Sequence, residues 1–426
     1  MRIVRLSLLI AVLMPCVRIQ AAELEAGAAK IDITPPIGFA MWGYGARHDR
    51  PSDGVLDPLQ ARALVLAVGD QRIAIVSLDL GRAPTRESTV AIRAKTKAAV
   101  GIEHIFLVGS HTHHGPVIEL DNWPSPTHSY VRELEQKLAA VIIEAAKAMR
   151  PARLGVASKE VPYNRNRHSK LPEKPVDREL LVLRVEDNEG KPIAHAVNFA
   201  AHPTMTDGKI FKFSADYPGA LAEIIEKATG APCLFLQGAA GDMSVNAGAH
   251  HGPQNLGKAL GMEVLSLART IHCAVPEKPT LRTYEEDFKF RNRVDLSNPL
   301  VKATYVRAFF PELVEFFVRE YRDGVRPHLS VALLSEQIGF VGVSGEFFCS
   351  HALSLKRRAR LPHLFFLGYC NDYQQYFPTV EAAAEGGYGA AAGVSTAEVG
   401  AGEQMMDHAL LQLYRMRGRY LDMPFK

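Results

Sequence analysis

Hydrophobic residues along this chain form short continuous runs that alternate with stretches of helical period. Apolar runs of strand length predict buried strands, and they lie at residues 71–80, 105–108, 180–185, 193–199, 233–236, 331–343 and 363–367. Helical periodicity occurs at residues 86–100 and 129–149, and in the second stretch apolar residues three or four apart form one face. This alternation predicts an α/β fold, a mixed and mostly buried β-sheet flanked by helices.

Longer stretches towards the C-terminus also have helical character. Residues 300–321 read as one long helix, and residues 403–416 as another. The charged region 276–327 is a weak candidate for a domain boundary, and the sequence shows neither an internal repeat nor a low-complexity linker. We therefore expect a single large domain over residues 23–426.

The N-terminus has the pattern of a cleaved secretory signal over residues 1–22. Arg2 and Arg5 precede an apolar run, and the small residues Ala21 and Ala22 follow it. The run is shorter than the roughly 20 residues that cross a bilayer. Lipidation of Cys16 is the alternative, but the preceding Pro15 fits that signal poorly. We expect a secreted or periplasmic protein with no stable membrane anchor.

Charge and cysteine content exclude several other classes. Lys and Arg number 49 and Asp and Glu number 46, and no basic run carries interleaved aromatic residues, so a nucleic-acid partner is not expected. The cysteines after the signal are far apart and form no CxxC pair, which indicates neither a zinc knuckle nor a disulfide framework; they are Cys233, Cys273, Cys349 and Cys370. One disulfide is compatible with export, but its pairing cannot be read from the sequence. The sequence also carries no signal of the oligomeric state.

The most informative short segment is Val-Gly-Ser-His-Thr-His-His-Gly-Pro at residues 108–116. In extended chain, residues two apart point the same way, so His111 and His113 can face one site. The segment 108–116 follows a predicted strand, and α/β proteins bind ligands at the carboxyl ends of strands. The histidines are therefore candidates for metal binding or catalysis, although polar residues that merely end a strand are the alternative. Gly115 stands where metallo-β-lactamases have an Asp, so that pattern is absent.

Three other predicted strands end in candidate polar residues. His202 follows the run 193–199, and Glu346 follows a run and a glycine. A lone histidine is often structural, whereas a buried carboxylate needs a cation to face unless it points to solvent. The small-residue turn at 238–244 ends in Ser244 and either approaches a ligand or is an ordinary tight turn.

Taken in order, these segments resemble the catalytic domain of the neutral ceramidase family, from about Gly27 to the C-terminus. The resemblance is carried by residues 29–35, 43–44, 110–116, 164–167, 198–202, 214–217, 241–246 and 344–347, followed by Asn-Asp-Tyr-Gln-Gln-Tyr-Phe-Pro-Thr at 371–379 and Gly-Tyr at 387–388. Within them, His114 stands where the family usually has Ser, and Val245 replaces a Pro.

Carried over residue by residue, the resemblance implies a zinc site and a surrounding pocket. The implied zinc ligands are His111, His202, Glu346 and Tyr376, and the implied active-site residues are His113, Arg167, Tyr388 and Ser244. Ser244 is interpreted as a pocket residue rather than a nucleophile, because no partner base can be placed from the sequence. The role of Tyr376 as a ligand rests on the resemblance alone, and His114 has no assigned role.

The chemistry of these residue types agrees with that assignment. Two imidazoles and a carboxylate are the ligands of water-activating zinc hydrolases, in which the metal lowers the pKa of water to about 7. Arg167 and Tyr388 are suitable donors to charge that develops on an amide oxygen. With an ordinary pKa near ~6.5, His113 can protonate a leaving amine. We expect zinc-activated water to cleave a ceramide-like N-acyl amide to fatty acid and amine.

Two alternatives remain at this stage. One is a zinc amidase or esterase for a smaller acylated amine, lactone or sugar derivative, and the other is a binding protein that keeps the metal without turnover. Family members that act on ceramide carry a further C-terminal β-sandwich, whereas only 38 residues follow Tyr388 here. The two tryptophans, Trp42 and Trp123, either line the pocket mouth or are structural. From these features we predict a weaker dependence on acyl-chain length than a membrane-acting ceramidase would show.

Overall fold

The computed structural model describes residues 23–47, 50–121, 129–307 and 309–420. The predicted signal segment 1–22 and Trp123 lie outside the described residues. Cys233, Cys273, Cys349 and Cys370 are all free thiols, so the one disulfide considered from the sequence is not formed among them. Within the described ranges, no helix has both the length and the apolar character needed to cross a bilayer.

Most strands belong to two sheets. The larger has eight strands in the order β11 (Cys233–Gln237), β9 (Pro192–Phe199), β8 (Glu179–Asp187), β6 (Arg150–Glu160), β1 (Leu24–Asp32), β3 (Gln60–Val68), β4 (Gln71–Leu78) and β5 (His104–Gly109). The smaller has the order β13 (Leu281–Asp287), β14 (His328–Leu334), β15 (Ile338–Val343) and β17 (His363–Leu367). In the larger sheet only the pairs Glu25–Pro151 and Ala26–Arg150 join β1 to β6. This sparse junction divides it into two four-stranded halves.

The two halves and the small sheet enclose one apolar core. Strand β11 of one half contacts β3, β4 and β5 of the other, and β17 contacts both β9 and β11. Side chains from all three groups of strands meet there, for example Leu64, Leu183 and Phe340, each fully buried. Because strands covered on both faces favour continuous apolar sequence, this burial accounts for the unbroken hydrophobic runs.

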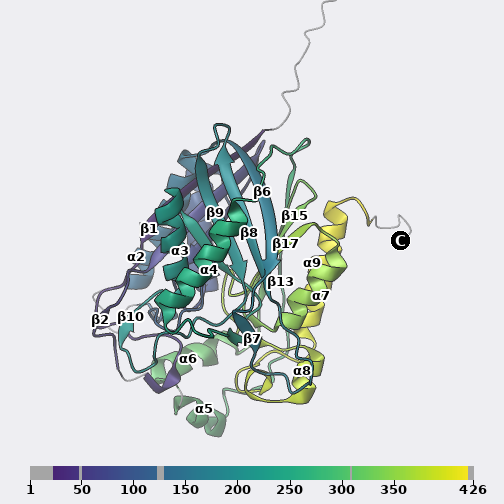
Figure 1. The fold of residues 1–426 in the computed structure, drawn as a ribbon. Coiled ribbons are helices and arrows are strands. Elements are labelled where there is room, and N and C mark those ends of the chain that lie inside the picture. Colours follow the sequence, from purple (N-terminus) through teal and green to yellow (C-terminus); the bar gives the residue numbers. More distant parts are fainter. Residues whose placement is uncertain (1–22, 48–49, 122–128, 308, 421–426) are drawn as a thin grey trace, which may run out of the picture.

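Pairs of helices cover the outer face of each four-stranded group (Figure 1). The pairs are α1 (Arg86–Val100) with α2 (Tyr130–Lys147), α3 (Asp216–Thr229) with α4 (Pro253–Ala268), and α7 (Cys349–Ala359) with α9 (Ala401–Met416). Local signals define their ends: the Thr85 side chain accepts from the Ser88 amide at the start of α1, and Gly101 ends it at φ 71°. The predicted α/β class is confirmed.

The order of elements repeats three times along the chain. In each group three antiparallel strands are followed by a helix, a fourth strand parallel to the third, and a second helix. The units are β1-β3-β4-α1-β5-α2, β6-β8-β9-α3-β11-α4 and β13-β14-β15-α7-β17-α9. The sequence shows no internal repeat, and the structure reveals one of another kind, because the units share element order without a sequence period.

Two predicted elements are each split in the structure. The run 331–343 forms a hairpin of β14 and β15, which turns at Ser335 and Glu336 with φ 52° and 56°. The predicted helix 300–321 consists of α5 (Pro299–Val306) and α6 (Pro311–Glu320). Pro311 begins α6 because proline lacks an amide donor and is tolerated only in the first turn of a helix.

Short elements gather at the end of the molecule where α5, α6 and α8 lie, at the bottom of Figure 1. They are η1 (Gly45–Arg47), β2 (Gly54–Val55) with β10 (Lys212–Phe213), β7 (Asn164–Asn166) with β12 (Met243–Val245), β16 (Glu346–Phe347) with β18 (Tyr376–Phe377), α8 (Val380–Glu385) and η2 (Tyr388–Ala390). These segments connect the strands of the core, and they carry most of the candidate site.

Candidate active site

Each of the three repeated units contributes one polar side chain to a common point. His111 lies two residues beyond β5, His202 three residues beyond β9, and Glu346 three residues beyond β15. Tyr376 is the direct partner of Glu346 in the parallel ladder of β16 and β18. Strand ends thus bring together residues that are up to 265 positions apart in the sequence.

The three side-chain tips form a compact triangle. Nε2 of His111 lies 3.1 Å from Nε2 of His202, and Oε2 of Glu346 lies 3.4 Å and 3.1 Å from these two nitrogens. Two ligands about 2.0–2.1 Å from a tetrahedral zinc ion lie about 3.3 Å apart. The spacing of the triangle therefore matches that of ligands around one ion.

The orientation of both imidazoles is fixed by backbone carbonyls. Nδ1 of His111 donates to Gly81 O at 2.8 Å, and Nδ1 of His202 donates to Ala240 O at 2.7 Å. Each Nε2 atom therefore faces the centre, where it can donate to Glu346 when protonated or offer a lone pair to a cation. Such carbonyl contacts are the usual outer partners of metal-binding histidines, so these residues fit a cation.

Glu346 is buried, 2% exposed, yet it is held in its ionised form. Burial alone raises the pKa of this carboxyl, but the neighbouring His111 and His202 outweigh that effect and hold the pKa well below its usual range. The hydroxyl of Tyr373 donates to Oε1, and that of Tyr369 lies 3.4 Å from Oε2. Neither tyrosine was assigned a role from the sequence, although Tyr373 lies inside the segment 371–379 that carried the resemblance.

Backbone constraints around the centre are unusually tight. His111 has φ 69°, a left-handed conformation that non-glycine residues seldom adopt and that tends to occur at functional sites. A side chain at Gly241 would place its Cβ 2.4 Å from the carbonyl oxygen of Glu346. The small-residue turn predicted at 238–244 therefore serves the close approach of two backbones beside the site.

His113 lies beside the triangle without being fixed in the same way. Its Nε2 is 3.4 Å from Nε2 of His111, and the three imidazoles have nitrogens within 4.8 Å of one another. Its Nδ1 has no hydrogen-bond partner within the described part of the chain. Burial, together with the nearby His111 and His202, lowers the pKa of His113 well below 6.5. In the metal-free protein this imidazole is therefore neutral near pH 7.

Arg167 links the triangle to Tyr376. It follows β7, and its Nη2 donates to Nε2 of His202 at 2.9 Å, to the hydroxyl of Tyr376 at 3.1 Å and to Gly241 O at 3.0 Å. Burial raises the pKa of Tyr376 well above 10, and the charge of Glu346 adds to this, so its hydroxyl stays protonated. A guanidinium and a phenol therefore meet beside His202, and of the two only Tyr376 is among the residues that line the cavity.

A cavity of about 770 Å³, including its part open to solvent, leads to this centre. His111, His113 and Glu346 lie at one side, and Trp42 and Tyr388 are also among the lining residues. Tyr388 is 70% exposed, and its ring lies 5.8 Å from that of Tyr376. Another part of the lining is an apolar wall that is built by residues within or just before α6, namely Phe309, Phe310, Leu313 and Phe317. Sequence reasoning did not identify this wall.

Two residues singled out in the sequence lie beside the centre without lining the cavity. Ser244, in β12, pairs through its backbone with His202, and it is absent from the described cavity lining. His114 is buried behind the site, where its Nε2 donates to Asp207 O at 3.2 Å. Burial, reinforced by Arg47, lowers the pKa of His114 to about 4. His114 points away from the triangle and takes no part in it.

Fold and site together define an α/β protein with an enclosed imidazole and carboxylate centre at the end of an apolar cavity. Such donor sets are those of metal-dependent hydrolases. The family model described as "Neutral/alkaline non-lysosomal ceramidase, N-terminal" matches residues 24–256, more than half of the chain. The protein belongs to this ceramidase family, as the resemblance predicted.

Solved structures extend the similarity beyond the matched residues. A neutral ceramidase from Pseudomonas aeruginosa aligns over 96% of this chain and 76% of its own, with a TM-score of 0.75 and 19% identity. A structure described as ceramidase complexed with C2 aligns over 95% and 77%, with a TM-score of 0.76 and 18% identity. At this identity the likeness shows a shared fold, and it covers the region of Glu346 and Tyr376, which lie outside the family match.

Proposed function

We propose that the protein is a zinc-dependent amidohydrolase of the neutral ceramidase type that cleaves an N-acyl amide to a fatty acid and an amine. The observation that carries this proposal is the triangle of His111, His202 and Glu346, with edges of 3.1–3.4 Å, at the end of an apolar cavity. Membership of the ceramidase family supports the same chemistry.

His111, His202 and Glu346 would hold the zinc ion, and the Tyr376 hydroxyl would complete the set. When bound, the ion supplies Lewis-acid activation of water and of the amide carbonyl. The carbonyls of Gly81 and Ala240 keep both imidazoles oriented for this role. Since Glu346 is ionised and buried, the set carries one negative charge that a divalent cation offsets.

Proton transfer is assigned to His113, which is neutral before the reaction begins. A neutral imidazole can accept a proton from the attacking water and then deliver it to the nitrogen of the leaving amine. Its position 3.4 Å from His111 brings it next to the reacting groups. The expectation from the sequence that His113 acts as a proton donor is thereby refined to a base that becomes an acid.

Arg167 and Tyr388 are the proposed donors to the amide oxygen as negative charge develops on it. Arg167 would give up its contact with Nε2 of His202 when that nitrogen binds the ion, whereas its contacts with Gly241 O and Tyr376 can hold it in place before the substrate arrives. Tyr388 is exposed at the cavity, so its contact with substrate requires little desolvation. Together they would border the oxygen from two sides.

The apolar wall formed by Phe309, Phe310, Leu313 and Phe317 supports an acyl group as the part of the substrate that is bound. Each methylene buried contributes roughly 0.8 kcal/mol, so efficiency should rise with chain length until the cavity is filled. A zinc amidase or esterase for a smaller acylated amine, lactone or sugar derivative is the second candidate, because the cavity volume of about 770 Å³ includes space open to solvent and the enclosed part is smaller.

Metal analysis followed by a substrate screen tests the proposal. Purified protein should contain about one zinc per chain and should hydrolyse acyl amides of short, medium and long chains, kept below their aggregation limits. A steep rise through long chains with turnover of ceramide in micelles would make it a full ceramidase, contrary to the weak dependence predicted from the sequence. Bound zinc without turnover of any amide or ester would favour a metal-retaining binding protein.

Export is a separate part of the proposal, supported by the Arg-flanked apolar run and the alanine pair before residue 23. Mass spectrometry of the mature N-terminus should find cleavage near Ala22 in a secreted or periplasmic fraction. Cytoplasmic protein that still begins at Met1 would contradict it.

A further inference from the structure

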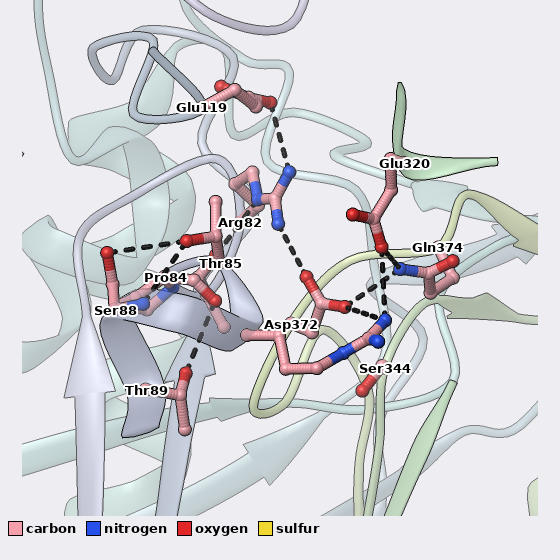
Figure 2. Close-up of polar contacts among 12 residues, drawn as sticks. Arg82, Pro84, Thr85, Ser88, Thr89, Glu119, Glu320, Ser344, Asp372 and Gln374 are labelled. Carbon is pink, nitrogen blue, oxygen red and sulfur yellow. Dashed lines mark hydrogen bonds and ion pairs between the residues drawn. The ribbon is translucent and has the colours of Figure 1, made fainter. Parts of the chain in front are cut away.

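A chain of polar contacts, buried at Arg82 and Asp372 and partly exposed at its far end, runs from the cavity-lining Glu119 to Glu320 (Figure 2). At its centre is Arg82, which is 1% exposed and lies between two carboxylates. Its Nη1 is 3.3 Å from Oε1 of Glu119, and its Nη2 is 2.8 Å from Oδ1 of Asp372. Arg82 follows β4 and Asp372 follows β17, so this contact joins the first and third repeated units.

The chain continues from Asp372 to the last residue of α6. Nε2 of Gln374 donates to Oδ2 of Asp372 at 2.8 Å and to Oε1 of Glu320 at 2.9 Å. Nη2 of Arg86 lies 3.0 Å from the same Glu320 oxygen and 3.7 Å from Oδ2 of Asp372. Glu320 thus ties the C-terminal end of α6 to the core through two separate donors, Gln374 and Arg86.

The other end of the chain reaches the reaction centre. Oε1 of Glu119 accepts from the indole nitrogen of Trp42 at 2.9 Å. The ring of Trp42 contacts the imidazoles of His111 and His113 at centroid distances of 5.1 Å and 5.8 Å. One continuous set of contacts therefore extends from the imidazoles to α6, whose apolar side chains form a wall of the cavity.

Helix geometry places this attachment close to the cavity wall. Phe317, a wall residue, is three positions before Glu320, and residues three apart lie on the same side of a helix. Leu313, a further turn back, is also in the wall. The partly exposed Glu320 is joined to the buried Asp372 through Gln374, and such hydrogen-bonded networks hold a defined arrangement. Movement of Glu320 would therefore shift both wall residues relative to the imidazoles.

We propose that Glu320 is a positioning residue that determines chain-length specificity, because it fixes α6, and with it the apolar wall, at a set distance from the His and Glu centre. This inference rests on the proposed function, since it assigns the acyl group to that wall. Loss of the Glu320 contacts would loosen the wall without touching the residues that carry out the reaction.

The test compares Glu320→Gln with Glu315→Gln, a matched change on the same helix. Glu315 forms an exposed ion pair with Lys302, away from this chain of polar contacts. Glu320→Gln should raise KM for long acyl amides about tenfold, with kcat, zinc content and the kinetics of short amides unchanged. Glu315→Gln should match the wild type throughout. An equal loss at all chain lengths, with a lower melting temperature, would reduce Glu320 to a structural role and overturn the inference.

A binding measurement separates this inference from the proposed reaction. In a Trp123→Phe background the emission of Trp42 reports on the cavity wall, so a long-chain fatty acid can be titrated without turnover. Glu320→Gln should weaken its affinity about tenfold, while a short-chain acid binds as before. Unchanged affinity would overturn the role of Glu320 even if amides are hydrolysed, whereas a wild type that binds the acid but hydrolyses no amide would refute only the proposed reaction.

Discussion

Nη2 of Arg167 lies 3.1 Å from the hydroxyl oxygen of Tyr376, although the two residues are 209 positions apart in the sequence. The same nitrogen donates to Nε2 of His202 at 2.9 Å. Since the Tyr376 oxygen accepts this hydrogen bond, its own proton is free to point towards Glu346 or a bound substrate. Tyr376 therefore joins the guanidinium to the candidate metal centre.

Replacement of Tyr376 by Phe removes this hydroxyl and preserves the ring. We expect kcat to fall by about 10²–10³ and metal affinity to fall about tenfold or more, as measured by kinetics and by competition with a chelator. Tyr388→Phe is the control for metal affinity, because this exposed residue lies outside the triangle, and it should retain the metal. Unchanged metal affinity in Tyr376→Phe would exclude the phenol as a ligand.

His111→Ala and His202→Ala should each abolish both metal binding and activity. Each change removes one of the two Nε2 atoms that lie 3.1 Å apart and leaves Glu346 without one of the partners that keep it ionised. Metal content by elemental analysis checks this result. His114→Gln is the matched control, because Gln retains a donor for Asp207 O, and it should retain metal and activity. Loss of the metal in His114→Gln, with the metal retained in His111→Ala, would mean that the ligand assignment is shifted along the motif.

Ser244→Ala should retain the metal and keep activity within about twofold of the wild type, as is usual for a substitution outside the reacting groups. Ser244 contacts His202 through the backbone, which the substitution preserves. Steady-state kinetics with one acyl amide is sufficient to test this. Complete loss of activity with intact metal would instead identify Ser244 as a nucleophile.

His328 should make stability depend on pH far from the site. Its Nδ1 lies 2.8 Å from Asp287, and Glu285 and Arg93 are also nearby. Burial opposes the charged imidazole, but Asp287 and Glu285 outweigh that effect and raise its pKa above 6.5. A raised folded-state pKa contributes stability that is present in full below about pH 6.5 and lost as pH rises through the folded value.

Chemical denaturation at a series of pH values measures this effect. The free energy of unfolding of His328→Gln relative to the wild type should show its largest deficit below about pH 6.5 and a smaller one above the raised pKa. A deficit that does not change with pH would mean that His328 acts through packing alone.

Local pattern predicted single elements well. The helix expected at 86–100 coincides with α1, and the run 363–367 coincides with β17. The two errors, at 300–321 and 331–343, arose where periodicity continued across a break that Pro311 and the Ser335–Glu336 turn impose. The spatial arrangement of these elements was harder to predict. The order of elements that occurs three times is a property of strand pairing, and it leaves no period in the sequence.

In the candidate site, too, single residues were predictable from local sequence, whereas contacts between distant segments were not. His111, His202 and Glu346 were each identifiable as polar residues after apolar runs, and the structure brings them together at strand ends. Neither the apolar wall of α6 nor the ion pairs of Arg82 left a local signal in the sequence. An apolar helix face has the same sequence pattern whether it packs in a core or lines a cavity, and a charged residue has the same local sequence whether it is buried or exposed. Only the contacts between distant segments, such as Arg82 with Asp372, distinguish them.

The site draws one side chain from the end of each repeated unit, and Tyr376 follows Glu346 in the third unit. During synthesis His111 and His202 therefore emerge before Glu346 and Tyr376. If the proposed zinc ion needs all four side chains, it can be bound in full only after the third unit has docked. Metal uptake would then serve as a chemical mark of completed folding.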